Sequence, residues 1–316
     1  MSKRELKQHV AVLNAFVDPY IDAALALPRD ELEKRTKTDE GYTFLHAIAA
    51  YTRDRSTLRD QLVSVLLAGR DTTACTLSWI FWEISQQPAI VAELRQEIYE
   101  RVGFNKAPSY DDLKNMKLLQ HVMNETLRLY PVVPFNIRVS LKDTTLPRGG
   151  GPDGDQPFGI PKNTPIGYST HYMQLTPEIY PEPSDTFPPP HVFAPKRWDH
   201  WTPKHWTYVP FNGGPRICVG QNFALMEMGY TIVRILQRFS KIEARMGGLQ
   251  ELDEKGRLVP RSLNMEQDER KWNQRPWVRS RGNEPDLVEK SIAMRDRMVS
   301  EIVLQPGRQV RVAFHE

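Results

Sequence analysis

The stretch "FNGGPRICVG" at residues 211–220 surrounds Cys218 with glycine and proline and places an arginine two residues before it. The glycines and the proline prevent regular structure before the cysteine, whereas the sequence from Val219 onward has helical periodicity. We therefore expect the thiol to lie in a tight loop at the N-terminus of a helix. Free backbone N–H groups and the helix dipole favour negative charge at that position, so the sulfur is placed to act as a thiolate.

The totals of the chain exclude several classes of protein. The 316 residues are 40% hydrophobic, which is enough for a substantial core, and the net charge of only +3 argues against a nucleic-acid partner. Cys75 and Cys218 form neither a disulfide framework nor a CxxC zinc motif, so we expect a reducing intracellular compartment. No run near the start approaches the roughly 20 apolar residues that a membrane span needs, so we expect neither an anchor nor a signal peptide.

Periodicity along the chain predicts a mainly α fold with small β-sheets. Helices are expected over residues 5–27 and 42–54, from about residue 56 to 87, from Pro88, through "MKLLQHVMNETLRLY" and again from Val219. The short runs "IRVSL" and "PIGYSTHYM" predict strands, and residues 175–215 predict an ordered but irregular meander. The last residues, "EIVLQPGRQVRVAF", have a Pro-Gly turn between two strand-like pieces and predict a β-hairpin.

This pattern suggests four segments. Residues 1–55 are a helical lead-in, 56–246 the functional core, 247–300 a polar insertion and 301–316 the C-terminal hairpin of the core. Within the insertion, the run "RKWNQRPWVRSR" at residues 270–281 combines basic residues with two tryptophans and no acid. A solvated loop is the simpler interpretation, and contact with an anionic membrane or nucleic acid is the alternative.

The features around Cys218 together suit a thiolate that ligates a haem iron. Arg216 supplies a fixed positive charge for a haem propionate, Phe211 is placed to pack beneath the sulfur, and Gly220 lets a flat group approach closely. A lone cysteine is ordinarily a small buried hydrophobe. The full pattern F-x-x-G-x-R-x-C-x-G decides against that interpretation, because Phe211, Gly214, Arg216, Cys218 and Gly220 all match it. The pattern resembles the haem-binding loop of the cytochrome P-450 superfamily.

The long predicted helix holds a second motif, "AGRDTT" at residues 68–73. Glycine in the middle of a helix costs about 1 kcal/mol, so Gly69 calls for a compensating role, and it opens a gap in an apolar stripe. The motif resembles the oxygen-activation segment of the same superfamily. That resemblance implies that the gap holds dioxygen and that Asp71 and Thr72 supply protons. A solvated helix charge is the competing interpretation of Asp71.

Three further residues resemble a structural set of the superfamily. Glu125 and Arg128 have the i, i+3 spacing of "ETLR", and a surface pair of this kind carries no functional information by itself. In the superfamily an arginine from the meander joins this pair, which implies that Arg197 in "FAPKRW" meets them and fixes the core on the thiolate side. Lys196 replaces the usual glutamate before that arginine, which puts the local ion pairing in doubt.

Arg138, in "PFNIRVS", matches a family position that often reaches a haem propionate, and a solvated strand arginine is the alternative.

The run "GGGPDG" at residues 149–154 formally fits G-x-G-x-x-G, but a proline interrupts it and the residues that follow do not predict a helix. We expect a turn between strands there, so that nicotinamide binds on a partner protein.

The resemblance implies a haem-thiolate fold and a monooxygenase that inserts one oxygen atom of O2 into an aliphatic C–H bond. It implies heme b as the cofactor, a small apolar substrate, and an NADPH-dependent flavoprotein reductase as the electron donor. The runs "LPRGGGPDG" and "YVPFNGGPRICVGQNFAL" are similar to fungal hydroxylases of n-alkanes and fatty acids. Tailoring of a secondary metabolite is a further option within the same family.

Members of the superfamily are typically longer and carry an N-terminal anchor in the endoplasmic reticulum membrane, so the N-terminal part of the fold is expected to be missing here. We accordingly expect a cytoplasmic protein or one that contacts the membrane peripherally. The alternative function, from a different class, is a catalytically silent remnant that binds haem weakly or serves as a scaffold.

Overall fold

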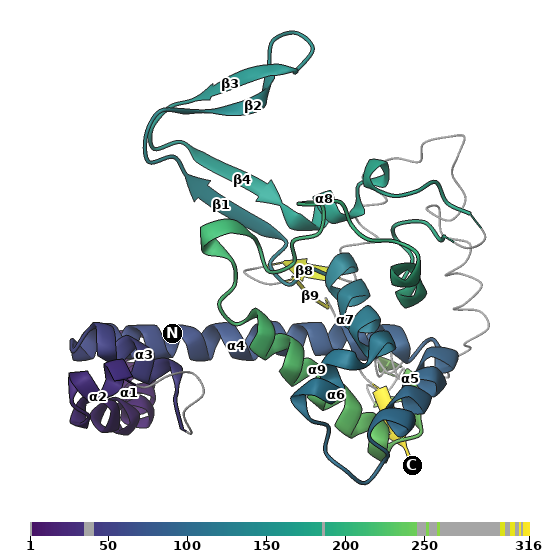
Figure 1. Cartoon of the computed structure of the whole chain (residues 1–316), viewed down its shortest axis with the longest axis horizontal. Coiled ribbons are helices and arrows are strands. Elements are labelled where there is room, and N and C mark those ends of the chain that lie inside the picture. Colours follow the sequence, from purple (N-terminus) through teal and green to yellow (C-terminus); the bar gives the residue numbers. More distant parts are fainter. Residues whose placement is uncertain are drawn as a thin grey trace. The chain divides into compact units, whose positions relative to one another are not determined.

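The computed structural model describes residues 2–34, 41–184, 187–244, 251–252, 258–259, 298–300, 304–306, 310 and 312–316. These residues are mostly helical and form small antiparallel sheets, which confirms the predicted fold class (Figure 1). The chain forms two compact units, Met1–Asp71 and Thr72–Glu316, and each is described by itself. The basic, tryptophan-rich run 270–281 lies outside the described residues.

The first unit is a small helical assembly. It contains α1 (Lys3–Ala26), α2 (Arg29–Lys34), α3 (Phe44–Tyr51) and the first part of α4 (Arg55–Ile84). The predicted helices are present, with α2 as an addition. Ser2 and Glu5 cap α1 reciprocally, which satisfies free N–H groups of the first turn. The core consists of one apolar face from each helix, namely Val17, Ile21, Ala24, Leu32, Leu45, Ala49 and Leu58.

Helices also build the core of the second unit. They are the remainder of α4, α5 (Pro88–Arg101), α6 (Tyr110–Asn115), α7 (Lys117–Leu129), α8 (Thr170–Leu175) and α9 (Gln221–Arg238). Pro88 is the first residue of α5, where its missing N–H is harmless, and Gly103 ends that helix with a φ of 77°. Fully buried side chains of α5, α7 and α9 form one cluster that includes Leu94, Ile98, Leu119, Met123, Ile232 and Leu236.

Two consecutive antiparallel ribbons follow α7. Strand β1 (Phe135–Val139) pairs with β4 (Pro165–Ser169), and β2 (Thr144–Gly150) pairs with β3 (Gln156–Ile160). Figure 1 shows the β2–β3 ribbon continuing outward from the β1–β4 pair. Residues 151–155 form the predicted turn between β2 and β3, and Gly149, Gly151 and Gly154 have positive φ. The strand expected over "PIGYSTHYM" is too long, because the Ser169 hydroxyl accepts the Tyr172 N–H and starts α8.

The prediction of a C-terminal hairpin across the Pro-Gly turn is wrong. Strand β9 (Leu304–Pro306) pairs with β8 (Met298–Ser300), whereas β10 (Val312–His315) pairs with β5 (Lys241–Ala244), the strand that follows α9. The ring of Phe314 on β10 contacts the rings of Phe81 and Phe239. Burial of apolar surface against the helical core therefore favours the long-range pairing over the local turn. Two short strands, β6 (Glu251–Leu252) and β7 (Leu258–Val259), also pair.

The meander between α8 and α9 contains three short 3-10 turns and otherwise irregular backbone among its described residues. These are η1 (Pro177–Ile179), η2 (Pro195–Asp199) and η3 (Gly214–Arg216), each with proline as its first or second residue. The prediction of an ordered but irregular segment is confirmed.

Candidate functional site

The cysteine loop, residues 211–220, is closed by its own backbone. The Cys218 N–H donates to the Phe211 carbonyl over 2.9 Å, and the Ile217 N–H donates to the Gly214 carbonyl over 3.1 Å. Gly220 is the N-cap of α9, and no side chain caps this helix end. Cys218 therefore lies in a tight turn two residues before the N-cap of α9.

The side chains around the sulfur are exposed and largely apolar. Cys218 is exposed, and Ile217, Val219 and Phe223 are 53%, 85% and 69% exposed. A Cβ atom at Gly220 would lie 3.9 Å from the sulfur, so glycine keeps the space beside the sulfur free. Cys75, the other cysteine, is buried. The loop thus presents one accessible thiol within an apolar surface.

Two of the predicted site residues are exposed arginines. Arg216 lies two residues before Cys218, and Arg138 lies on β1 with its guanidinium carbon 5.6 Å from the centre of the Tyr168 ring. Within the described part of the chain, neither guanidinium makes an ion pair with a carboxylate. A free guanidinium is a strong bidentate partner for a carboxylate group.

The "AGRDTT" motif lies within α4, and the boundary between the two units falls between Asp71 and Thr72. A Cβ atom at Gly69 would meet no atom within 4 Å, so the glycine faces open space. The Asp71 side chain is 64% exposed and lies 3.8 Å from Arg70, which is the geometry of a solvated helix charge. The carbonyl of Thr72 accepts the Thr76 hydroxyl over 3.2 Å.

The residues of the predicted structural set meet at the fully buried Glu125 carboxylate on α7. Arg128 donates two hydrogen bonds of 2.8 Å to the two Glu125 carboxylate oxygens, and Arg197 donates a third of 2.9 Å. The Ala194 N–H and the Trp198 indole N–H complete the shell, each at 2.9 Å. All three charged side chains have no exposure to solvent. The structure therefore brings Arg197 from the meander onto the α7 pair.

The same two arginines organise the proline-rich meander. Arg197 donates to the carbonyls of Pro188 and Pro189 over 3.0 Å and to Val192 over 2.9 Å, and Arg128 donates to the carbonyl of Pro190. Prolines lack an N–H, so this stretch cannot form a regular ladder, and the guanidinium groups satisfy its carbonyls instead. The irregular backbone before the cysteine loop is thus held by side chains.

Glu125 and Arg128 stabilise each other's charge, whereas burial and the like charge of Arg128 lower the pKa of Arg197. Burial raises the pKa of Glu125, but the adjacent Arg128 and Arg197 guanidinium groups outweigh it and hold that pKa below its ordinary value. Burial lowers the pKa of Arg128, and the Glu125 carboxylate outweighs it, so the pKa is raised. Trp198 was not predicted to take part, although its position directly after Arg197 in "KRW" was the available signal.

The doubt about Lys196 is resolved by the structure. Its ammonium group lies 2.8 Å from Glu93 on α5, and both side chains are largely exposed. The basic residue therefore finds its acid on another helix and stays outside the buried network.

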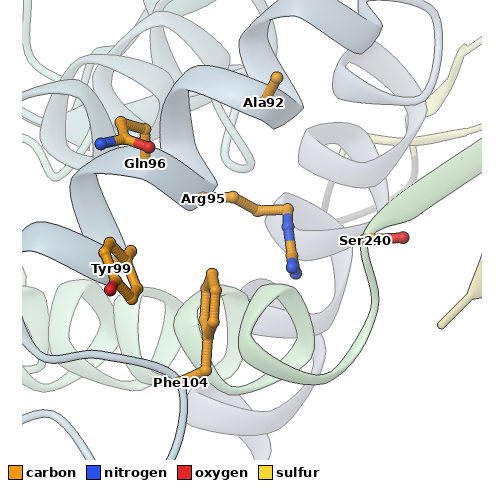
Figure 2. Close-up of a pocket in the computed structure, with 6 residues that line it drawn as sticks. All are labelled: Ala92, Arg95, Gln96, Tyr99, Phe104 and Ser240. Carbon is orange, nitrogen blue, oxygen red and sulfur yellow. The ribbon is translucent and has the colours of Figure 1, made fainter.

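A cavity of about 390 Å³ lies away from the cysteine loop. It is lined by Ala92, Arg95, Gln96, Tyr99, Phe104 and Ser240. Figure 2 shows the Arg95 side chain extending between Phe104 and Ser240. Arg95 donates to the carbonyls of Leu236 and Phe239 at the end of α9, and its guanidinium stacks on Phe104. Its charge thus complements the C-terminus of a helix, which is a structural role.

The described residues place two limits on other kinds of site. They contain no cluster of three or more His, Cys, Asp or Glu side chains arranged to hold a metal ion. Within the same part of the chain, no helix has the length and apolar character needed to cross a membrane.

Comparison with known proteins identifies the family. The model of the family described as cytochrome P-450 matches residues 2–265. The chain is 50% identical over all of its 316 residues to cytochrome P-450 monooxygenase pvhE of Talaromyces variabilis, of which it covers 51%. It is 44% identical over 246 residues, or 76% of the chain, to cytochrome P-450 52A1 of Candida tropicalis, of which it covers 44%. The chain belongs to the cytochrome P-450 family, and it spans about half the length of these curated relatives.

The residues of the cysteine loop fit the haem group that this family implies. A haem iron needs one thiolate, its macrocycle needs apolar contacts, and its propionates need cations. Cys218 is accessible at a helix N-terminus, Ile217, Val219 and Phe223 expose apolar surface around it, and Arg216 makes no ion pair among the described residues. The donor set and its surroundings are therefore chemically suited to haem.

Proposed function

We propose that this chain carries the haem-binding core of a monooxygenase that inserts one oxygen atom of O2 into an aliphatic C–H bond. One observation carries the proposal: Cys218 lies exposed in a backbone-closed turn at the start of α9, within the loop pattern of the family to which the chain belongs. Thiolate ligation by that sulfur favours O–O cleavage when heme b is bound.

The surrounding residues have supporting roles in this proposal. Arg216 and Arg138 bind the haem propionates through charge-assisted hydrogen bonds. Phe211 packs beneath the sulfur, and Gly214 and Gly220 let the loop turn tightly and leave room beside the thiolate. The Glu125, Arg128 and Arg197 network holds the meander and thereby the approach to the loop.

Protons reach the reaction through α4 in this proposal. Asp71 takes up protons from solvent, which its exposure allows, and the hydroxyl of Thr72, the following residue in the chain, passes them on. Gly69 leaves the helix surface open at the same turn, so that dioxygen and a small apolar substrate can approach.

The resemblance to fungal hydroxylases supports an n-alkane or a fatty acid as the substrate class, with tailoring of a secondary metabolite as the second candidate. The electron donor is an NADPH-dependent flavoprotein reductase of the endoplasmic reticulum membrane. This chain contacts that membrane peripherally. The family relation supports a reductase of this kind.

Replacement of the ligating sulfur tests the proposal directly. The chain supplied with haem is expected to give the red-shifted Soret band of thiolate ligation in its ferrous carbon-monoxide complex, and Cys218→Ala is expected to lose that band completely. Cys75→Ala is the matched control and is expected to keep it, because Cys75 is buried in α4 and does not belong to the cysteine loop. A colourless parent protein, or an unchanged band in Cys218→Ala, contradicts the proposal.

Replacement of the hydroxyl on α4 tests the proton route. Thr72→Ala is expected to keep the thiolate band but to form less product per NADPH and more peroxide, because the proton donor is lost. The assay uses a flavoprotein reductase with a medium-chain fatty acid and an n-alkane. Ser78→Ala, which removes another hydroxyl bonded within α4, is the control. Equal product per NADPH in Thr72→Ala and the parent removes Thr72 from the mechanism, and haem binding without any product favours the silent remnant.

A further inference from the structure

Asn212 is unusual within the cysteine loop. It follows Phe211, whose carbonyl accepts the Cys218 N–H and closes the loop, and its φ of 61° lies in the left-handed region. Asparagine tolerates this conformation better than most residues, but glycine suits it better still. The backbone alone therefore does not explain an asparagine here, and its side chain needs a separate reason.

The Asn212 side chain bonds to both strands of the β1–β4 pair. The Tyr168 hydroxyl on β4 donates to Asn212 Oδ1 over 2.7 Å, and Asn212 Nδ2 donates to Asn136 Oδ1 on β1 over 3.2 Å. Asn136 and Tyr168 are direct partners in the strand register. One amide group thus bonds to both sides of a single rung of the sheet.

The same rung is next to the predicted propionate cation. Arg138 is two residues after Asn136 and therefore on the same face of β1. Its guanidinium carbon lies 5.6 Å from the ring of Tyr168, the residue that donates to Asn212. Contacts of Tyr168 thus connect the cysteine loop to the strand that carries Arg138.

We infer that Asn212 is a positioning residue that ties the cysteine loop to the β1–β4 sheet and so sets the Cys218 sulfur relative to the Arg138 guanidinium. It acts through the backbone turn that the Cys218 N–H closes. The inference rests on the proposed function, because a fixed relation between thiolate and cation matters when one ligand engages both. A loop held on one side only would let the sulfur move independently of the cation.

A second contact on the loop must be separated from this tether. A Cβ atom at Gly213 would lie 2.3 Å from the Trp206 ring, so that ring packs directly on the loop backbone. Among the described residues, Trp206 has no hydrogen bond to the Asn212 amide and no ring contact with the β1–β4 sheet. Variants that alter only the amide or only the Tyr168 hydroxyl therefore isolate the tether.

Two variants and a control test the inference in the full chain. Asn212→Gly keeps the left-handed backbone and removes the amide, and Tyr168→Phe removes a single hydroxyl. Tyr172→Phe is the control, because Tyr172 is 76% exposed on α8. The first measurement is hydrogen exchange of the amides of residues 211–218 in the haem-free chain. Exchange is expected to be about fivefold faster in Tyr168→Phe, which loses one hydrogen bond, and faster still in Asn212→Gly, which loses two. It is expected to be unchanged in Tyr172→Phe.

The second measurement is the ferrous carbon-monoxide spectrum of the haem-loaded chain. Both tether variants are expected to convert part of the thiolate band into the form without thiolate, and their double variant is expected to resemble Asn212→Gly because they share one bond. Parent-like exchange in both variants overturns the inference, and so does a change in Asn212→Gly alone. A parent chain without the thiolate band refutes the proposed function, while the haem-free exchange still decides the tether.

Discussion

The buried network of α7 and the cysteine loop differ in how far their polar groups are exposed to solvent. Glu125, Arg128 and Arg197 have no solvent exposure, and both Glu125 oxygens accept hydrogen bonds from the protein. Cys218 is exposed, and it is flanked by Ile217 and Val219, which are also exposed. The protein itself supplies the hydrogen-bond partners of the buried charges in the first region, whereas it leaves the Cys218 thiol of the second region accessible.

This difference separates structural from functional use of polar groups. A buried ion set is costly to desolvate, so it is tolerated only when every charge is paired, and it then specifies geometry more than it adds stability. An exposed thiol contributes little to folding, so its surroundings are constrained by what it binds. We therefore expect substitutions in the network to change stability and substitutions in the loop to change haem ligation.

The largest expected effect is that of Glu125→Gln. The neutral amide leaves Arg128 and Arg197 buried without a counter-charge, which is expected to lower the free energy of unfolding by about 3–5 kcal/mol. Urea denaturation followed by tryptophan fluorescence measures the change. Glu93→Gln is the matched control, because it removes a carboxylate from an exposed pair with Lys196 and is expected to cost less than about 1 kcal/mol. Equal stability of the two variants would remove the contrast between the regions.

The same network predicts how stability depends on pH. The pKa of Glu125 in the folded chain is lowered from an ordinary value of 4.5, so the folded state binds this proton less readily than the unfolded state. Its contribution is fully present above the unfolded pKa and is lost as pH falls through the lower folded pKa. The stability difference between the parent and Glu125→Gln is therefore expected to narrow below pH 4.5. Parallel stability curves from pH 7 downward contradict this assignment.

A smaller effect is expected in the cysteine loop from Gly214→Ala. Gly214 has a φ of 68°, and a left-handed conformation costs an L-residue roughly 1–2 kcal/mol. The variant is expected to lose about that much stability and to shift part of the thiolate band as well. Gly159→Ala is the control, since a Cβ atom there meets nothing within 4 Å. If Gly214→Ala loses stability but keeps an unchanged band, Gly214 has a structural role like the α7 network and does not affect haem ligation.

Local signals in the sequence predicted the helices well. Pro88 starts α5 and Gly103 ends it because each residue has a backbone preference that acts at its own position. The C-terminal hairpin failed for the opposite reason. A Pro-Gly turn favours a local pairing, but the partly buried Phe314 ring contacts the rings of Phe81 and Phe239, which are far away in sequence. Tertiary burial outweighed the turn signal.

The candidate site shows the same limit. The spacing of Glu125 and Arg128 predicted their pairing, and resemblance to the family brought in Arg197. Trp198 entered the network without any spacing rule, because its indole reaches Glu125 only through the fold of the meander. The Asn212 tether was likewise not predicted, since Asn136 and Tyr168 become partners only when β1 and β4 pair.

The sequence by itself determined the family, the helical character of the chain and the ligand candidate Cys218, because these depend on residue types at short spacing. Only the tertiary structure decided which carboxylate is buried, which arginines are buried with it and which stay exposed, and how the cysteine loop is held. Those properties depend on the desolvation of each side chain and on contacts between residues far apart in the chain. Neither quantity is encoded at a single position.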